Sequence, residues 1–154
     1  YNRVKMLTMD PRFYYYKNSM INRNLFDENL VIDCEMNSGS SYEAMERYLE
    51  KNKKPPKALF ISSDATAAGI LKAIREHGFL VPGDCNIVTY NNTTFSESST
   101  PPLDSIEVYL KESAKEATFA LERFWNAEKL PRKIVIPCSL VIRGSIKKQE
   151  NNGE

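Results

Sequence analysis

The sequence predicts an α/β fold of three layers, in which a mainly parallel sheet has helices on both faces. Short apolar runs alternate with helical patterns from the start of the chain to Tyr90. This alternation is typical of strand–helix–strand units joined by right-handed crossovers. The run at 58–61 is apolar at every position, as expected of a parallel strand that is buried on both faces.

The first two strands are predicted at 4–9 and 30–36. Asp10-Pro11 follows the first of them and predicts a helix that has an N-cap aspartate and a proline at its first position. Its inward face would carry Phe13, Tyr16 and Met20 at helical spacing. The second strand would stop at 37–39.

Two further helices are predicted between the next strands. Ser40 and Glu43 form a capping-box pattern, and the helix that they begin would end at Pro55-Pro56. After the strand at 58–61, Asp64 is expected to cap a helix that ends at Gly78 in the left-handed conformation. The apolar stripe of that helix comprises Ala67, Ile70, Leu71 and Ile74. The fourth strand is predicted at 86–90.

The pattern changes after this strand. Residues 93–102 form a polar connection that is longer than usual, and a short strand follows at 105–109. A helix is then expected with one apolar face, formed by Leu110, Ala114, Ala117, Leu121 and Phe124. Pro137 interrupts the last strand, at 134–142, so that strand should lie at a sheet edge. Residues 146–154 are predicted to be a polar tail.

The composition excludes several classes of function. No apolar run approaches the ~20 residues that span a bilayer, so no membrane partner is expected. The formal net charge is +1, whereas a domain that binds DNA by itself usually has a basic face. The lysines at 51, 53, 54 and 57 are interpreted as a solvated turn. We therefore do not expect this chain to bind nucleic acid directly.

The cysteines and the single histidine argue against metal, disulfide and catalytic chemistry. Cys34, Cys85 and Cys138 are widely spaced in apolar stretches, which predicts three buried thiols in a reducing cytoplasm. His77 is expected in the last turn of a helix, where it interacts favourably with the helix dipole. The chain has no P-loop, no G-x-S-x-G turn and no G-x-G-x-x-G after a strand. We expect neither a cofactor nor an enzyme.

Polar residues follow each predicted strand, at 10–12, 36–38, 62–64 and 91–92. In open α/β sheets, ligands bind at the carboxyl ends of the strands. A sugar suits this mixture because each hydroxyl both donates and accepts hydrogen bonds. Plainer interpretations remain open: Asp64 as a helix cap, Arg12 as an exposed first-turn residue, and Asn91 as part of a turn. Tyr14 or Tyr15 could offer a ring on which a sugar face stacks.

Several stretches together resemble the lactose- and galactose-repressor (LacI/GalR) family. The segment at 58–74 is similar to its apolar strand, Asn-Asp and helix, and 77–88 matches its Gly-x-x-Val-Pro-x-Asp-x-x-Val stretch. Residues 101–106 resemble its Pro-Pro-Leu-Thr-Thr-Ile crossover, and 136–143 its closing strand. A looser match joins Arg12, Tyr15 and Tyr16 to the family's Arg-x-x-Gly-aromatic pattern.

The resemblance implies a periplasmic-binding-protein-like fold of two lobes with the effector in the cleft between them. It implies a cytoplasmic, homodimeric, sugar-responsive repressor that binds operator DNA through an N-terminal helix-turn-helix. Residues 1–145 would be the C-terminal portion of the effector domain, with 105–127 returning to the first lobe. That lobe and the helix-turn-helix would be absent from this chain.

The same resemblance implies the ligand-binding residues. Arg12 matches the arginine that binds sugar hydroxyls, and Met36 matches a residue that lines the pocket. Asp64 matches the family aspartate, whereas Ser63 stands where asparagine is usual and Asn91 where aspartate is usual. Two alternatives follow: an extracytoplasmic sugar-binding protein of a transport system, which shares the fold, and a dimerisation module whose pocket has decayed.

Overall fold

The computed structural model describes residues 10–126 and 133–148. The elements in chain order are α2 (Pro11–Ile21), the 3-10 helix η1 (Glu28–Leu30), α3 (Ser38–Asn52), β1 (Ala58–Phe60), α4 (Asp64–Glu76), β2 (Asn86–Tyr90), α5 (Thr94–Ser98), β3 (Asp104–Glu107), α6 (Leu110–Trp125) and β4 (Ser139–Val141). The first predicted strand, at 4–9, lies outside the described residues.

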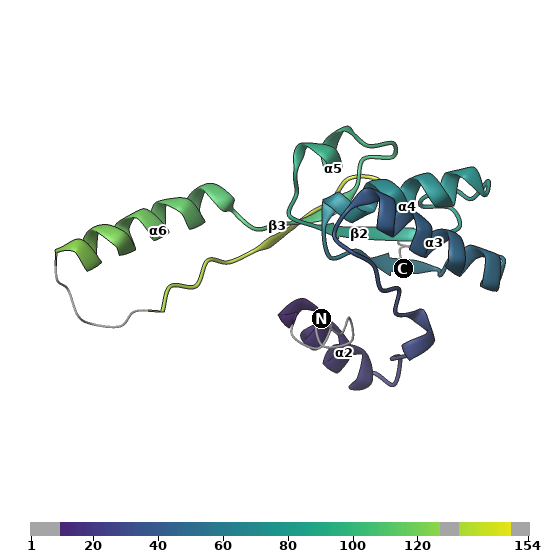
Figure 1. The fold of residues 1–154 in the computed structure, drawn as a ribbon, viewed down its shortest axis with the longest axis horizontal. Coiled ribbons are helices and arrows are strands. Elements are labelled where there is room, and N and C mark those ends of the chain that lie inside the picture. The colour runs from purple at the N-terminus through teal and green to yellow at the C-terminus, as the bar shows by residue number, and fades with distance from the viewer. Residues whose placement is uncertain (1–9, 127–132, 149–154) are drawn as a thin grey trace, which may run out of the picture.

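The described strands form a single sheet in the order β1-β2-β3-β4 (Figure 1). β1, β2 and β3 are parallel, with Leu59 opposite Ile87 and Thr89 opposite Ser105. β4 joins β3 in the antiparallel sense, with Ile106 opposite Leu140. The final strand therefore forms an edge, as Pro137 predicted, but it is shorter than the 134–142 expected.

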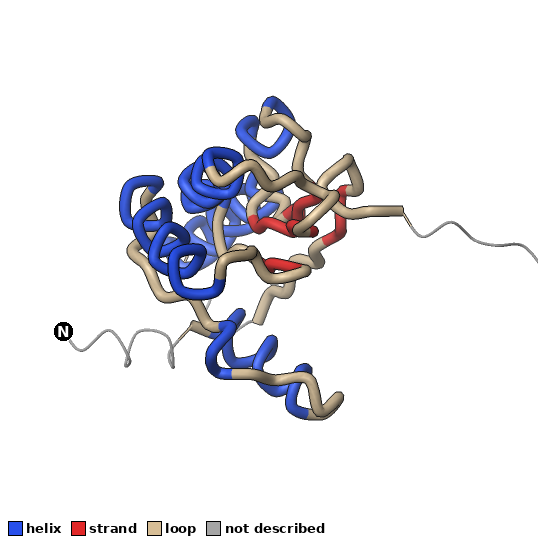
Figure 2. Tube along the Cα trace, turned by 90° about the vertical axis from the view of Figure 1, so that its right-hand side faces the viewer, coloured by secondary structure: helices blue, strands red, loops and turns tan. Residues whose placement is uncertain are grey.

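The core lies between the sheet and a layer formed by α3 and α4 (Figure 2). The stripe predicted for α4 is buried, and its members contact side chains of α3 and β2, among them Met45, Leu49 and Ile87. α4 approaches α3 most closely at Gly69, where a Cβ atom would clash with the carbonyl oxygen of Ser38. The two helices are thus held at a distance that only glycine permits.

The prediction of a strand at 30–36 is wrong. Residues 31–35 belong to no helix or strand, and η1 precedes them. Asp27 caps that short helix by accepting a hydrogen bond of 2.9 Å from the backbone N–H of Asn29. A strand needs a neighbouring strand to satisfy its backbone N–H and C=O groups. No described strand lies beside residues 30–36, so their apolar composition is not enough to make them a strand. The predicted burial of the strand at 58–61 is correct only for Ile61, since Phe60 is 39% exposed.

The predicted helix caps are partly displaced. Asn37, and not the Ser40–Glu43 pair, caps α3 by accepting a 2.8 Å hydrogen bond from the N–H of Ser40. Ser63, and not Asp64, caps α4. Short side chains next to one another compete for these N–H groups, so the sequence locates a cap to within one to three positions. Gly78 has the predicted left-handed φ, at 78°.

The two terminal helices pack least. α2 and α6 contain no fully buried residue, and α6 projects away from the sheet (Figure 1). The polar connection at 93–102 contains the short helix α5. Of the three cysteines, Cys85 is buried, Cys34 is half-buried and Cys138 is exposed. The expectation of three buried thiols is therefore confirmed only for Cys85, and it fails most clearly for Cys138, because β4 and the residues before it leave side chains open to solvent.

Candidate functional site

Arg12 joins the start of α2 to the end of β1. Its Nη1 donates a hydrogen bond to the carbonyl oxygen of Ser62, two residues beyond the strand. Its Nε and Nη2 donate to the carboxylate of Asp10, at 3.0 and 2.7 Å. This hydrogen bonding lowers the pKa of Asp10 and raises that of Arg12. Asp10 thus both caps α2 and fixes the plane of the guanidinium.

The same guanidinium lies over the last residue of β2. Its central carbon is 5.2 Å from the centroid of the Tyr90 ring, a cation–π geometry. Arg12 therefore stands at the carboxyl ends of two adjacent parallel strands, where open α/β sheets bind ligands. Its side chain is 27% exposed, and only some of its five N–H donors are bonded to other described residues. The arrangement can offer directed donors to a polar ligand.

Ser63 and Asp64 are organised for the structure of this strand end. The Ser63 hydroxyl accepts a 3.2 Å hydrogen bond from the N–H of Ala65. The Asp64 Oδ2 accepts hydrogen bonds from the N–H and hydroxyl of Thr93, at 2.7 and 2.8 Å. Both residues are almost fully buried. Burial by itself would raise the pKa of Asp64, but hydrogen bonding, including the two bonds from Thr93, lowers it. Asp64 ties the start of α4 to the segment after β2, while its ligand role stays a prediction.

Asn91 follows Tyr90 directly and is half-buried. Its φ is 103° and that of Asn92 is 50°, so two consecutive residues occupy the left-handed region that asparagine tolerates better than most residues. The Asn91 N–H donates a 3.0 Å hydrogen bond to the carbonyl oxygen of Ile106. The turn predicted here therefore exists, and it places Asn91 next to the ring that lies under Arg12.

Tyr15 and Met36 stand apart from this cluster. Tyr15 is 70% exposed and Met36 is 56% exposed. Tyr15 makes an edge-to-face contact with Tyr14, at 5.3 Å between ring centroids. Tyr16 stacks on Phe60 of β1, at 6.1 Å. Among the polar and ring contacts of the described residues, none joins Tyr15 or Met36 to Arg12.

Sequence reasoning missed two members of the cluster. Asp10 was expected as a helix cap and as one of the polar residues at a strand end, but not as the ion-pair partner of Arg12, and Tyr90 was expected only as the end of a strand. The spacing of Asp10 and Arg12, two positions apart at a helix start, is the one signal that could have suggested their ion pair. Nothing in the sequence brings Tyr90 to Arg12. That contact depends on the parallel pairing of β1 with β2.

The described residues contain no group of three or more potential metal-binding side chains. No described helix is both long and apolar enough to cross a bilayer.

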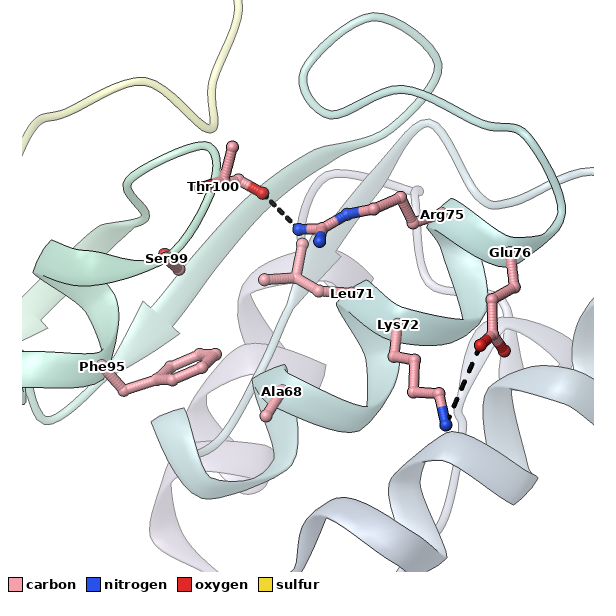
Figure 3. Close-up of a pocket in the computed structure, with 8 residues that line it drawn as sticks. All are labelled: Ala68, Leu71, Lys72, Arg75, Glu76, Phe95, Ser99 and Thr100. Carbon is pink, nitrogen blue, oxygen red and sulfur yellow. Dashed lines mark hydrogen bonds and ion pairs between the residues drawn. The ribbon is translucent and has the colours of Figure 1, made fainter.

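Away from Arg12, a concave surface lies between α4 and the segment that contains α5 (Figure 3). Its volume is about 460 Å³. Leu71 and Phe95 contribute apolar surface, and Arg75 donates a hydrogen bond to the carbonyl oxygen of Thr100. Lys72 and Glu76 lie one helical turn apart on α4, with a distance of 3.8 Å between Nζ and Oε1. This surface, called the α4–α5 surface below, therefore combines an apolar centre with charges of both signs.

Residues 2–146 match the family described as periplasmic binding protein-like domain. The chain belongs to this family. The α/β fold class predicted from the sequence is thereby confirmed, and the mixed sheet with its helical layer fits it.

The curated relatives of this periplasmic binding protein-like domain are transcriptional regulators. GalR of Streptococcus thermophilus, an HTH-type transcriptional regulator, is 31% identical over 139 residues, which cover 90% of this chain and 42% of that protein. MelR of Bacillus subtilis (strain 168), an HTH-type transcriptional repressor, is 32% identical over 115 residues, which cover 75% of this chain and 33% of that protein. The chain thus spans less than half the length of either relative.

The similar solved structures are also regulators. The complex of the transcriptional regulator CelR with cellobiose has a TM-score of 0.76 at 26% identity, covering 84% of this chain and 40% of that one. The transcription regulator CcpA of Lactococcus lactis has a TM-score of 0.77 at 26% identity, covering 86% of this chain and 48% of that one. The predicted resemblance to the LacI/GalR family is confirmed.

Proposed function

We propose that this chain is the effector-sensing domain of a sugar-responsive, DNA-binding transcriptional repressor. The position of Arg12 across the ends of β1 and β2 carries the proposal. A guanidinium that is held by Asp10 and Ser62, and that has donors unused by the described residues, is oriented before a ligand arrives. This reduces the entropy lost when the ligand binds. The cellobiose complex of a similar regulator supports a carbohydrate as the effector.

The expected ligand contacts come from several strand ends. Arg12 would donate to neighbouring sugar hydroxyls, and Asn91 would both donate and accept. Tyr15 would stack on the sugar face, and Met36 would line the apolar side of the pocket. Ser63 and Asp64 would act from the cap of α4. Because Tyr15 and Met36 are largely exposed, closure by a second lobe would be needed to bring them onto the ligand.

The second lobe would be formed by polypeptide outside these residues. Residues 1–145 would belong to the effector domain, and 105–127 would return to that lobe, as the outward direction of α6 suggests (Figure 1). A DNA-binding domain elsewhere in the regulator would contact the operator. The ligand would favour the closed arrangement, since it can shift the equilibrium only by its differential affinity for the two states.

We further propose a cytoplasmic homodimer without catalytic activity. A two-fold interface pairs one surface with itself. The α4–α5 surface suits this, because Lys72 of one copy could meet Glu76 of the other around an apolar centre of Leu71 and Phe95. Sedimentation of the charge-reversed Lys72→Glu variant tests this interface. Monomers are expected for the variant and dimers for the unchanged regulator.

Calorimetry with galactose, cellobiose, lactose and ribose tests the effector proposal on the full-length regulator. Arg12→Ala should lower the affinity for whichever sugar binds by about tenfold to a hundredfold, the range of one charge-assisted hydrogen bond. It should leave the affinity for the operator unchanged. Arg23→Ala is the matched control, because Arg23 follows the same helix and its side chain bonds only Ser19 among the described residues. If Arg12→Ala and Arg23→Ala bind equally well, Arg12 has no ligand role.

A further inference from the structure

Asn92, in the turn after β2, bonds residues of β3 and of the segment that follows β4. Its Oδ1 accepts a 2.7 Å hydrogen bond from Nη2 of Arg143. Its Nδ2 donates a 2.7 Å hydrogen bond to Oε2 of Glu107, the last residue of β3. Its backbone N–H donates to the hydroxyl of Ser105, at 3.0 Å. The amide thus uses its donor and its acceptor on different elements, so neither bond can be replaced by flipping the side chain.

The partners of Asn92 are themselves fixed. Arg143 lies just after β4 and donates through Nη1 to the carbonyl oxygen of Leu103, at 2.9 Å. Oε1 of Glu107 accepts a 2.7 Å hydrogen bond from the N–H of Tyr109. The hydrogen bond from Asn92, joined by that of Tyr109, lowers the pKa of Glu107. A continuous path of short bonds therefore runs from the turn after β2 to the start of α6.

The start of α6 is the point where its direction is set. Tyr109 has a φ of 49° and precedes the first turn of α6, so the chain bends there. The Tyr109 hydroxyl lies 2.8 Å from that of Ser139 on β4. α6 has no buried residue, and its first turns face residues 134–137 across an open groove. The polar contacts at its N-terminus are therefore a restraint on where the helix points.

We propose that Asn92 is a positioning residue that couples the backbone at Asn91, a candidate ligand contact, to the direction of α6. This proposal rests on the proposed function, because that function makes Asn91 a ligand contact. It adds the set of hydrogen bonds through which ligand binding would change the position of α6 in a regulator. The two left-handed asparagines are adjacent, so a rotation of the peptide between them moves the Asn92 amide against Glu107 and Arg143. Short, directional hydrogen bonds do not tolerate such a rotation, and the start of α6 must follow.

Spin labels on α3 and α6 measure this direction without any ligand. Glu50→Cys and Ala120→Cys are labelled in the full chain with Cys34→Ser and Cys138→Ser, while the buried Cys85 is left in place. Double electron–electron resonance then gives the distribution of distances between the helices. Asn92→Ala should broaden the distribution. The swap Asn92→Asp with Glu107→Gln should restore the narrow one, because the new amide at position 107 would then donate to a carboxylate at position 92 that still accepts from Arg143.

The matched control separates positioning from general loosening. Asn24 is also left-handed, with a φ of 56°, and it lies outside this network. Asn24→Ala should lower the melting temperature and leave the α6 distances unchanged. If it broadens them as much as Asn92→Ala does, or if the swap fails to restore them, the inference is overturned.

Coupling to Asn91 is tested by a double-mutant cycle on the same labels. Asn91→Gly relaxes the φ of 103° and should shift the distances in the parent chain. It should add nothing once Asn92→Ala is present, since residues that act in one network are not additive. An equal shift in both backgrounds would show that Asn92 does not carry the coupling. A failure to bind any tested sugar would defeat the proposed function and leave these distances unaffected.

Discussion

The hydroxyl of Ser41 on α3 donates a hydrogen bond of 2.9 Å to the carbonyl oxygen of Thr66 on α4. Both residues are buried, and the bond lies beside Gly69, where the helices approach most closely. The position of α4, and hence of its cap at the candidate site, depends on this contact.

Gly69→Ala should destabilise the domain by about 1–3 kcal/mol, the usual cost of overpacking. The added methyl group would clash with the backbone of Ser38, so α3 would have to move. Urea denaturation followed by circular dichroism measures the change. Gly39→Ala is the control, because its nearest contact would be an ordinary 3.5 Å from Oδ1 of Asn37. Equal stability of the two variants would refute the close approach.

Asp104 should make folding stability depend on pH in the acid range. Its carboxylate is almost fully buried and accepts hydrogen bonds from the N–H groups of Arg143, Ser145 and Ile146. Burial would raise the pKa of Asp104, but these bonds lower it below the ordinary value of 3.8. The stabilisation is therefore complete above the unfolded pKa and is lost as the pH falls through the folded one.

Asp104→Asn tests this contribution. An amide NH2 group facing backbone N–H donors leaves them unpaired, so the variant should lose about 1–3 kcal/mol at neutral pH. Its stability should also decline less steeply than that of the parent chain below about pH 4, near the unfolded pKa of aspartate. Parallel pH profiles for the two proteins would contradict the prediction.

The three thiols should differ in reactivity. Cys138 is exposed and should react first with a thiol reagent such as DTNB at pH 8. Burial raises the pKa of Cys34, and it raises that of Cys85 to about 12. Since the thiolate is the nucleophile, Cys34 should follow and Cys85 should react only on unfolding. Stopped-flow traces of the single Cys→Ser variants assign each phase, and a fast Cys85 phase in native protein would contradict the structure.

Ser63→Ala should cost about 1 kcal/mol, the usual value for the loss of an N-cap. Ser63→Asn should keep the cap, because asparagine also accepts from the second N–H of a helix. Thermal melts of the two variants decide whether Ser63 is needed as a cap. Loss of stability in both would mean that space, and not the cap, limits position 63.

Local patterns predicted the elements whose own residues determine them. The stripe of α4, the strand β2 and the left-handed Gly78 each follow from spacing or from one residue's backbone freedom. The interval 30–36 has the composition of a strand but no described neighbour with which to pair. The cap of α4 moved by one residue, because Ser63 and Asp64 are both good caps and only the fold turns Asp64 toward Thr93.

The candidate site was predictable as a location more than as a set of contacts. The rule that ligands bind at the carboxyl ends of parallel strands led to Arg12 and Asn91. The sequence did not reveal that Tyr90 lies under Arg12, or that Asn92 joins Glu107 to Arg143. Each of these contacts requires strands that are distant in the chain to be adjacent in the sheet.

The sheet receives its last strand from far along the chain. β3 ends at Glu107 and β4 begins at Ser139, and the path between them contains α6. β4 is held by its ladder with β3 and by the hydrogen bonds that Asp104 accepts from Arg143, Ser145 and Ile146. A chain cut once between β3 and β4 should therefore remain assembled as two fragments. The segment between β3 and β4 is thus a suitable place to split the domain for a fragment-complementation reporter.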